Sequence, residues 1–383
     1  MVRAIMANSI DPSFNPLTAS LVTTESFDMS AIPKTQSQSD LAAFSKKIAA
    51  LGMQPLWERT ARMVPGTSCK PFAWRYAETR PYLQQASGLI SKSDAERRVL
   101  MLENPTLRGT TFSTPTLFAG LQIILPGEIA RSHRHSPAAL RFILEGEGAY
   151  TAVGGERVSM SPGDFVVTPS WAWHDHGNLG DQPVIWLDGL DTPFAALFGA
   201  MFREDHPQAT QPIERFEEVS DADFDPRLLP DYRSKPSTAL LPTIPQLNYP
   251  LLRYPYTRTR EALRALAATS APHPAHGYKL RYAHPGTGGY PFPTMAVFMQ
   301  WLPRGFTGAR YRATDSSVLV IAEGRCEIEL DGQKLALAHN DVLALPAWES
   351  YRLCANEDAV IFSYSDRAAQ EALGLWREAT GEV

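Results

Sequence analysis

Apolar residues recur at helical spacing in several stretches of this chain. Leu41, Phe44 and Ile48 lie three or four positions apart, which places them on one face of an amphipathic helix. A polar residue at position 39 or 40 can cap this helix, and Gly52 ends it. The same spacing predicts three further helices: 94–101, 258–268, and a C-terminal helix that Ser365 opens and that carries Leu373 and Trp376.

Two long blocks alternate apolar and polar residues at the period of a β-strand. They span about 112–190 and 279–363, and turns rich in Gly, Pro and Asp divide them into short segments. By contrast, residues 1–37 are rich in Ser, Thr and Pro, so we expect a disordered arm, or one that orders only against a partner subunit. Residues 200–245 are rich in Pro and acidic residues, which predicts a linker with little regular structure.

The two strand-rich blocks repeat each other. The run from Arg141 to Gly148 (RFILEGEG) matches the run from Leu319 to Cys326 (LVIAEGRC). Each run is followed by the same three features in the same order: a Gly turn (Gly154-Gly155; Asp331-Gly332), an acidic turn (Gly163-Asp164; Asn340-Asp341) and a Pro-x-Trp (Pro169-Ser-Trp171; Pro346-Ala-Trp348). A repeat of this length predicts two copies of one barrel in a mainly β chain.

These patterns divide the chain into five predicted parts. They are a disordered arm (1–37), an N-terminal helical segment (38–105), a first barrel (106–200), a linker with a helix (201–275) and a second barrel with the C-terminal helix (276–383). With 383 residues, the chain is long enough for two or three domains that each bury a core of their own.

Composition and charge describe an ordinary globular chain, 44% hydrophobic and 20% charged. The net charge of −5, with both signs mixed, gives no reason to expect nucleic acid or an anionic membrane as a partner. The longest apolar runs are too short to span a bilayer, and the N-terminus does not resemble a secretory signal. Three separated cysteines form no metal motif and no disulfide framework, which favours a reducing cytoplasm.

Three histidines in the first block indicate a metal site. His133 and His135 lie two positions apart in a predicted strand, so both face one side of it, and His174 follows about forty residues later. The alternative is scattered surface or core histidines, but four of the nine histidines fall within 44 residues. Imidazole ligands without thiolate suit zinc, copper, nickel or iron, and three of them leave coordination positions open for a substrate.

The second block lacks this set of histidines. Counting back from the shared Glu-Gly, Tyr311 and Ala313 occupy the positions of the first two histidines. Counting on from the shared proline, Tyr351 replaces the third. We therefore expect the second barrel to bind no metal and to have a structural role.

The histidine-bearing strands resemble the cupin superfamily. The matching positions are Gly127, His133-x-His135 and Gly146 in a first motif, and Gly163, Pro169, His174 and Asn178 in a second. Two positions differ from the usual pattern: Trp171 stands where many cupins have glycine, and neither Ala139 nor Leu140 supplies the glutamate that many use as a fourth ligand. Without that carboxylate the ion keeps its full charge, which favours a doubly anionic, chelating substrate.

Longer motifs resemble the gentisate 1,2-dioxygenases from about residue 55 to the C-terminus. They include Ala95-Glu-Arg-Arg98, Leu102-Glu-Asn-Pro105, Trp173-His-Asp-His-Gly-Asn178, Trp186-Leu-Asp-Gly-Leu-Asp191, Gly277-Tyr-Lys-Leu-Arg-Tyr282 and Gln370-Glu-Ala-Leu-Gly-Leu-Trp376. The resemblance implies a bicupin, that is, two double-stranded β-helix (jelly-roll) barrels in one chain. It also implies Fe(II) held by His133, His135 and His174, and a homo-oligomer, often a tetramer.

The implied reaction inserts O2 into the ring of gentisate between the carboxyl-bearing carbon and its hydroxyl-bearing neighbour, which gives maleylpyruvate. Gentisate can chelate a metal through its carboxylate and ortho hydroxyl. Relatives of that family cleave salicylate or 1-hydroxy-2-naphthoate, so a 1,2-dioxygenase for either acid is the alternative within the class. Outside the class stand a cupin binding or storage protein and a metal-dependent sugar-phosphate isomerase, which the missing glutamate argues against.

Two candidate catalytic residues follow the histidines along the predicted strands. Arg141 lies six residues after His135, on the same strand face, and its guanidinium matches a substrate carboxylate. The alternative is a surface arginine beside Glu145. His176 faces the same interior as His174, and it could hydrogen-bond the substrate or oxygen, or accept the proton of the chelating hydroxyl.

Four further residues are candidates for lining the substrate pocket. Arg97, carried over from the Glu-Arg-Arg match, is also a third candidate catalytic residue that covers the pocket, with a solvated arginine on an amphipathic helix as the alternative. Asp188 could orient a ligand histidine, with an ordinary strand-end turn as the alternative. Gln122 is a second lining candidate. Phe118 stands where salicylate-cleaving relatives have tryptophan, and its alternative is plain core packing.

Overall fold

The computed structural model describes residues 37–91, 97–216 and 251–381. The chain divides into two compact units, Met1–Met63 and Val64–Val383. No helix among the described residues is long and apolar enough to cross a membrane.

The first unit contains the predicted amphipathic helix. Helix α1 spans Ser37–Ala49, and Gly52 follows it with a φ of +74°, which confirms the predicted stop. A 3₁₀ turn, Leu56–Glu58, places Trp57 against Phe44 with ring centroids 6.4 Å apart. The predicted disordered arm lies, apart from its last residue, outside the described residues.

The second unit contains a first barrel, whose strands form two six-stranded sheets. One sheet has the order β13 (Arg253–Tyr254), β8 (Phe165–Thr168), β5 (Ala139–Glu145), β10 (Val184–Leu190), β3 (Phe118–Ile124) and β2 (Arg98–Met101). The other has the order β11 (Arg203–Asp205), β4 (Ile129–His135), β9 (His174–Asn178), β6 (Ala149–Val153), β7 (Glu156–Met160) and β12 (Arg215–Phe216). A short helix, α3 (Thr192–Leu197), follows β10.

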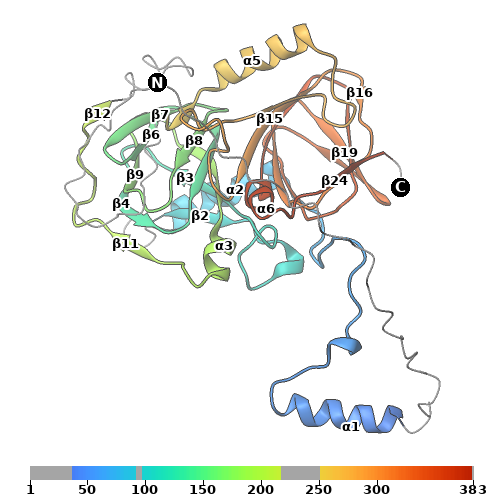
Figure 1. The fold of residues 1–383 in the computed structure, drawn as a ribbon. Helices are drawn as coiled ribbons and strands as arrows, with labels where there is room; N and C mark the ends of the chain where they lie inside the picture. The colour runs from blue at the N-terminus through green and yellow to red at the C-terminus, as the bar shows by residue number, and fades with distance from the viewer. Residues whose placement is uncertain (1–36, 92–96, 217–250, 382–383) are drawn as a thin grey trace, which may run out of the picture. The chain divides into compact units, whose positions relative to one another are not determined.

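The second barrel repeats this arrangement with a smaller second sheet. Its six-stranded sheet has the order β1 (Phe72–Trp74), β21 (Val342–Leu345), β18 (Ser317–Glu323), β23 (Ala359–Ser365), β15 (Ala296–Leu302) and β14 (Tyr278–Arg281). The remaining strands are β16 (Phe306–Thr307), β22 (Arg352–Ala355), β19 (Cys326–Leu330) and β20 (Gln333–Leu337), and the pair β17 (Tyr311–Ala313) and β24 (Glu378–Thr380). The green and orange barrels of Figure 1 confirm the predicted mainly β bicupin fold.

A backbone detail shows how closely the two barrels repeat. Trp171 and Trp348, the tryptophans of the two Pro-x-Trp sequences, have φ values of +62° and +65°. Their backbone N–H groups donate to the carbonyl oxygens of His135 and Ala313, at 2.9 and 2.6 Å. Because a positive φ favours glycine, this conformation explains why many cupins have glycine at the position of Trp171.

Each barrel receives an edge strand from the segment that precedes the other barrel. Strand β1 precedes the first barrel in the chain but pairs with β21 of the second. Strand β13 precedes the second barrel but pairs with β8 of the first. The exchanged strands lead into helices α2 (Tyr76–Leu89) and α5 (Tyr256–Thr269), of which α5 confirms the helix predicted over 258–268.

The acidic turns of the repeat anchor the exchanged segments. Asp341 Oδ1 in the second barrel accepts the backbone N–H of Tyr76, the first residue of α2, at 2.8 Å. Asp164 Oδ1 in the first barrel accepts the backbone N–H of Tyr256, the first residue of α5, at 2.9 Å. An acceptor at this position satisfies a donor that a helix start otherwise leaves without a partner.

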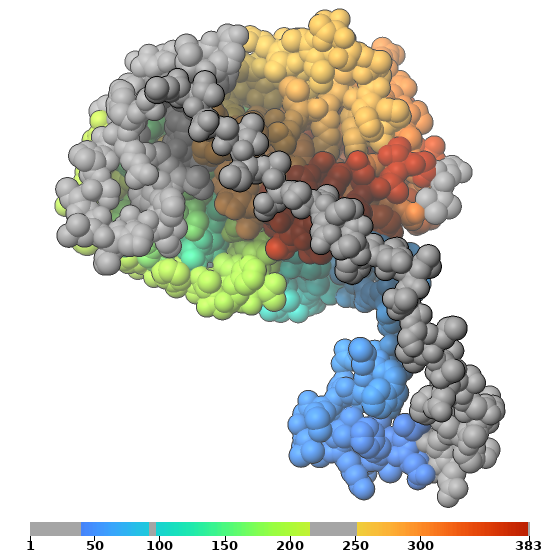
Figure 2. Space-filling model, in the orientation of Figure 1, coloured from blue at the N-terminus to red at the C-terminus, as the bar shows by residue number. Residues whose placement is uncertain are grey.

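One hydrophobic core extends across both barrels. Phe142 of β5 and Phe362 of β23 are fully buried and stack with ring centroids 4.1 Å apart and planes 8° apart. The hydroxyl of Tyr364, also buried, donates to the carbonyl oxygen of Phe118 at 2.7 Å. In Figure 2 the red atoms of the C-terminal segment adjoin the teal and yellow-green atoms of the first barrel.

The helix predicted over 94–101 is wrong. Arg98–Met101 form strand β2, which pairs with β3, and residues 92–96 lie outside the described residues. The Arg98 guanidinium forms an ion pair of 2.7 Å with Glu128, and both side chains are largely buried. Pairing with β3 and this long-range ion pair therefore override the local helical pattern.

Helix α2 was missed because its sequence signal is weak. Only Tyr76 and Leu83 of this helix are buried, which leaves a faint apolar stripe. The helix also contains Pro81, which ordinarily argues against a helix interior.

The C-terminal helix is shorter than predicted. Helix α6 spans Arg367–Ala372, and Gly374, with a φ of +71°, follows its end. Leu373 and Trp376 therefore lie beyond the helix, and the Trp376 indole N–H donates to Asp315 at 3.0 Å.

The predicted linker contains more regular structure than expected. Its described part contributes β11 and β12 to the two edges of one sheet of the first barrel, while residues 217–250 lie outside the described residues. The five part boundaries drawn from the sequence remain predictions.

The exchanged strands predict that residues 64–383 unfold in one cooperative transition. Asp164→Ala and Asp341→Ala each remove an acceptor at a buried anchor, which should lower the free energy of unfolding by about 1–3 kcal/mol. Calorimetry should show a single peak that either substitution moves to a lower temperature. Asp331→Ala, at a side chain 77% exposed, is the control and should change stability by less than about 0.5 kcal/mol. Two separate peaks, of which Asp341→Ala moves only one, would contradict this expectation.

Candidate active site

The three predicted ligand histidines lie together in the first barrel. His133 and His135 are at the end of β4, where strand alternation directs both side chains to one face. His174 begins β9 and lies opposite His133 in the antiparallel pairing. The ring centroids are 5.5, 4.3 and 4.7 Å apart, and one potential ligand atom of each residue lies within 4.8 Å of the other two.

Backbone carbonyls fix the orientation of all three rings. The Nδ1 atoms of His133, His135 and His174 lie 2.9, 2.8 and 2.9 Å from the carbonyl oxygens of Arg131, Pro137 and Ala172, respectively. Because a carbonyl only accepts, each Nδ1 carries the proton and donates it. Each Nε2 then keeps its lone pair, which is the tautomer that a metal ligand needs.

Burial keeps these imidazoles neutral. It lowers the pKa of His133 to about 2 and that of His135 to about 4, and the positive charge of Arg97 adds to both shifts. Burial also lowers the pKa of His174 well below its usual value. At neutral pH no proton competes for the Nε2 atoms.

This donor set fits a divalent transition metal. Three neutral imidazole nitrogens on one side of an ion leave the opposite positions open, as in metal sites that also bind a substrate. Within the described residues, His174 Nε2 is buried and has no hydrogen-bond partner, so a metal would satisfy it. We conclude that His133, His135 and His174 are the residues that could hold such an ion.

Arg97 lies at the edge of the histidine group, in the bend before β2 rather than on the expected helix. Its Nη2 is 2.6 Å from His133 Nε2 and 2.9 Å from His133 Nδ1. The guanidinium therefore faces the side of the ring on which a metal would bind. A metal bound to this histidine would compete with Arg97 for Nε2.

Arg141 is buried inside the first barrel, with 1% of its surface exposed. Its Nη1 donates to Thr168 Oγ1 at 2.6 Å, and its Nε lies 3.3 Å from Asp188 Oδ1. The alternative of a surface arginine beside Glu145 is wrong, because Glu145 pairs with Arg80 instead.

Asp188 holds Arg141 rather than a histidine. The two residues lie opposite each other in the pairing of β5 with β10, and Trp186 Nε1 also donates to Asp188 Oδ1 at 3.0 Å. Burial raises the pKa of Asp188 and lowers that of Arg141, and each charge opposes the shift of the other. The expected role of Asp188 in orienting a ligand histidine is therefore wrong, since backbone carbonyls perform it.

His176 is fully buried next to the histidine group. Its ring centroid is 5.7 Å from that of His174, and its Nδ1 is 2.9 Å from Thr151 Oγ1. The same hydroxyl lies 3.2 Å from the sulfur of Met160, so it can donate to sulfur and accept the Nδ1 proton of His176. That tautomer leaves His176 Nε2 as an acceptor, and Nε2 has no partner among the described residues.

Gln122 and Phe118 both lie on β3. Gln122 is 2% exposed, and its Oε1 has no hydrogen-bond partner in the described part of the chain. The ring of Phe118 lies 3.2 Å from where a side chain at Gly120 would begin, and Gly120 lies opposite Asp188. Both residues therefore lie on the strand that pairs with β10, which carries Trp186 and Asp188.

Two threonines of the site were not predicted from the sequence. Thr151 lies opposite His176 in the pairing of β6 with β9, and Thr168 ends β8 beside Arg141. Only the strand register could have identified them, because it brings together residues that are far apart in the sequence.

The fold and the histidine group define the class as a bicupin with a three-histidine metal-site candidate. A Cupin domain family model matches residues 120–189. The chain is 42% identical to gentisate 1,2 dioxygenase 1 of Aquipseudomonas alcaligenes, over 88% of this chain and 95% of that protein. It is 32% identical to a 1-hydroxy-2-naphthoate 1,2-dioxygenase of Nocardioides sp. (strain KP7), over 90% of this chain and 89% of that protein.

A solved structure of a related enzyme is also similar to this chain. Salicylate 1,2-dioxygenase from Pseudoaminobacter salicylatoxidans, in its adducts with gentisate, matches with a TM-score of 0.79 and 30% identity, over 92% of this chain and 96% of that one. The chain belongs to the gentisate 1,2-dioxygenase family and is a ring-cleaving dioxygenase. The resemblance inferred from the sequence motifs is confirmed, and the non-oxygenase alternatives are set aside.

The buried ion pair predicts a large effect of Asp188→Asn on stability. This substitution leaves the Arg141 charge buried without a counter-ion, which should lower the free energy of unfolding by about 3–5 kcal/mol in urea titrations. The double variant Arg141→Met/Asp188→Leu removes both charges and should recover most of that loss. Asp331→Asn is the exposed control and should be neutral. A double variant as unstable as Asp188→Asn would contradict the pairing.

Proposed function

We propose that this chain is an Fe(II)-dependent dioxygenase that uses O2 to cleave gentisate between its carboxyl- and hydroxyl-bearing carbons, giving maleylpyruvate. The observation that carries the proposal is the convergence of three neutral imidazoles beside Arg97, Arg141 and His176. The 42% identity to a gentisate dioxygenase supports the choice of gentisate as the substrate.

Fe(II) is the proposed ion, held by His133, His135 and His174. Bound there, it would supply the electrons that activate O2 and a Lewis acid for the substrate oxygens. Three imidazoles alone do not distinguish iron from manganese, so the choice of iron rests on the family.

The substrate carboxylate is proposed to lie between Arg141 and Arg97. Thr168 accepts from Nη1 of Arg141 and Asp188 lies beside Nε, so Nη2 is proposed as the nitrogen that contacts the substrate. Because Asp188 neutralises Arg141 in part, the attraction for an anion also needs the positive charge of Arg97. A substrate that chelates the metal through its carboxylate and hydroxyl would draw Arg97 away from His133.

His176 is proposed to receive the proton of the chelating hydroxyl. If Thr151 accepts from Nδ1, Nε2 keeps a lone pair, and this atom has no partner among the described residues. A neutral imidazole next to a metal-bound phenol is suited to hold that proton or to hydrogen-bond the substrate. His176 is fully buried, and this burial lowers its pKa, so the imidazole is neutral before a substrate binds.

Three other residues complete the proposed substrate pocket. Gln122 offers a buried amide to the substrate, and Asp188 keeps Arg141 in place. Phe118, at the start of β3, is proposed to pack against the aromatic ring. Its carbonyl accepts the hydroxyl of Tyr364, so the position of Phe118 depends on the second barrel.

Salicylate or 1-hydroxy-2-naphthoate is the alternative substrate. A 5-aminosalicylate 1,2-dioxygenase of Comamonas sp. is 30% identical to this chain, and the naphthoate enzyme is 32% identical. Both values are lower than that for the gentisate enzyme, which favours gentisate. The homotetramer and the cytoplasmic location remain predictions from the sequence.

Oxygen uptake tests the proposed reaction. After anaerobic reconstitution with Fe(II), we expect uptake of one O2 per gentisate and slower or no uptake with salicylate and 1-hydroxy-2-naphthoate. Faster uptake with either of the latter two would move the assignment to the alternative. If none of the three acids caused uptake, the proposed function would fail.

His174→Ala tests the proposed ligand set. The substitution leaves two imidazoles, so we expect the purified protein to lose its iron and all gentisate-dependent oxygen uptake. Iron is measured by atomic absorption after gel filtration, and circular dichroism checks the fold, which the second barrel should preserve. His339→Ala, at an exposed histidine of the second barrel, is the control and should retain both properties. Full activity of His174→Ala would refute the ligand assignment.

A further inference from the structure

The second barrel has lost the buried ion pair of the first. The repeat aligns Arg141 with Leu319. Arg141 lies opposite Asp188, and Leu319 lies opposite Ser363, so Ser363 corresponds to Asp188. A leucine and a serine therefore replace an arginine and an aspartate at the centre of the second barrel.

The ligand positions of the second barrel have lost their histidines. Tyr311 lies opposite Tyr351, as His133 lies opposite His174 in the first barrel. Among the described residues, the group that could hold a metal contains residues of the first barrel alone.

The second barrel has a lysine at a strand position where the first barrel has an uncharged residue. By the register of the central strands, Gln300 corresponds to Gln122. Gln122 lies opposite Val99 of β2, whereas Gln300 lies opposite Lys279 of β14. The second barrel has thus gained a cation where the first has valine.

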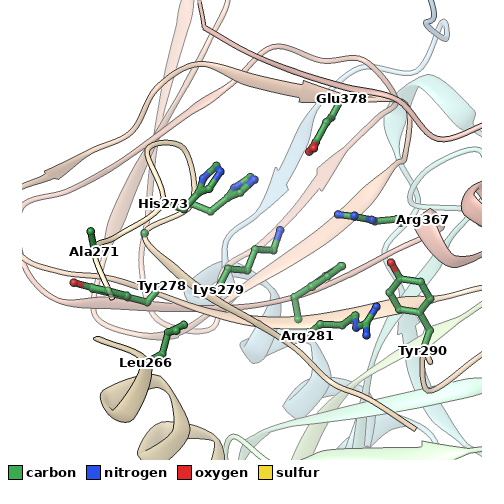
Figure 3. Close-up of a pocket in the computed structure, with 12 residues that line it drawn as sticks. Leu266, Ala271, His273, Tyr278, Lys279, Arg281, Tyr290, Arg367 and Glu378 are labelled. Atoms are coloured by element: carbon green, nitrogen blue, oxygen red, sulfur yellow. The ribbon is translucent and has the colours of Figure 1, made fainter. Parts of the chain in front are cut away.

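Lys279 lies beside a cavity of about 480 Å³, which is within the size range of small-molecule sites. Figure 3 shows the Lys279 amino group, the Arg367 guanidinium and the Glu378 carboxylate pointing toward the same space. A smaller cavity, which Lys279 and Arg367 also line, reaches Tyr311 and Tyr351. The larger cavity therefore lies next to the positions where the first barrel has its metal ligands.

The two cations nearest this space differ in how they are held. Arg367 donates to Glu371 at 2.7 Å and lies 3.7 Å over the ring of Trp376. Lys279 is half-buried, and its Nζ lies 4.4 Å over the ring of Phe298. In the part of the chain that the structure describes, this ammonium has neither a hydrogen bond nor an ion pair.

The charge of Lys279 is costly to the folded chain. Burial lowers the pKa of Lys279 to about 8, with Asp315 and Glu378 opposing the shift and Arg367 adding to it. The group is still mostly protonated at pH 7, and the half-buried ammonium has lost part of its hydration without an ion pair among the described residues. Such a group destabilises the fold unless a partner from outside the chain compensates it.

We propose that the second barrel binds a small organic carboxylate in this cavity, with Lys279 and Arg367 as the groups that hold the anion. Arg281, which stacks 4.8 Å over Tyr290, adds positive charge at the cavity wall. Glu378, whose carboxylate accepts the hydroxyl of Tyr311, restricts the anion to the side of the two cations. The site is not catalytic, and it does not depend on the iron or the turnover proposed for the first barrel.

Isothermal titration calorimetry on the full-length His174→Ala protein tests this site, since the variant removes a proposed iron ligand and so avoids turnover. The probes are gentisate, an aromatic acid, and maleate, an aliphatic dicarboxylate, which distinguish the two kinds of carboxylate. In this background, Lys279→Met should weaken binding of the better probe at least about tenfold, the equivalent of one charge-assisted hydrogen bond. Lys334→Met, at a lysine 63% exposed that pairs with Glu327 and Glu329, should leave it unchanged.

Thermal unfolding separates a ligand-binding role of Lys279 from a structural one. Without probe, Lys279→Met should have a Tm equal to or above that of its parent, because it removes a desolvated charge. The better probe should raise the Tm of the parent more than that of Lys279→Met, and Lys279→Arg should recover binding. A lower Tm for ligand-free Lys279→Met would overturn the proposal. So would the absence of binding, or binding that Lys279→Met does not weaken.

Discussion

The chemistry of the first barrel depends on three imidazoles that stay neutral and fixed. His133, His135 and His174 each donate their Nδ1 proton to a carbonyl two residues away in the chain. The chain next to each ring therefore also sets its tautomer, without help from a distant carboxylate. Burial removes the competing proton, and three neutral donors leave the charge of a metal uncompensated by its protein ligands. Because Asp188 already pairs with Arg141, this carboxylate is not free to balance that charge.

The two barrels share a frame but not an interior. In both barrels the tryptophan two residues after the shared proline has a positive φ. In both, the aspartate of the acidic turn accepts the backbone N–H of the first residue of a helix. Inside the frame, Arg141 and Asp188 give way to Leu319 and Ser363, and Lys279 appears on another strand. The positions that set the backbone are thus separate from those that set the chemistry, which is how one fold accommodates different sites.

The features that could be predicted from the sequence are those with a local signal. The repeat, the strand periods and the spacing of His133, His135 and His174 indicated a bicupin and its metal-site candidate. Two of the failures involve partners that are distant in the sequence. The ion pair of Arg98 with Glu128 accompanies a strand where the local pattern favoured a helix. The role expected for Asp188 was wrong because its pairing partner, 47 positions earlier in the chain, is known only from the register.

The reciprocal exchange of β1 and β13 bears on how the chain can be shortened. A fragment that ends between the barrels would contain β1 without its partner, and β8 would lose the neighbour that covers its edge. The complementary fragment would leave β21 open in the same way. Exposed edges of this kind promote aggregation, so neither half is suited to separate expression. If a single ancestral barrel was duplicated, this exchange would have made each copy depend on the other to complete its sheet.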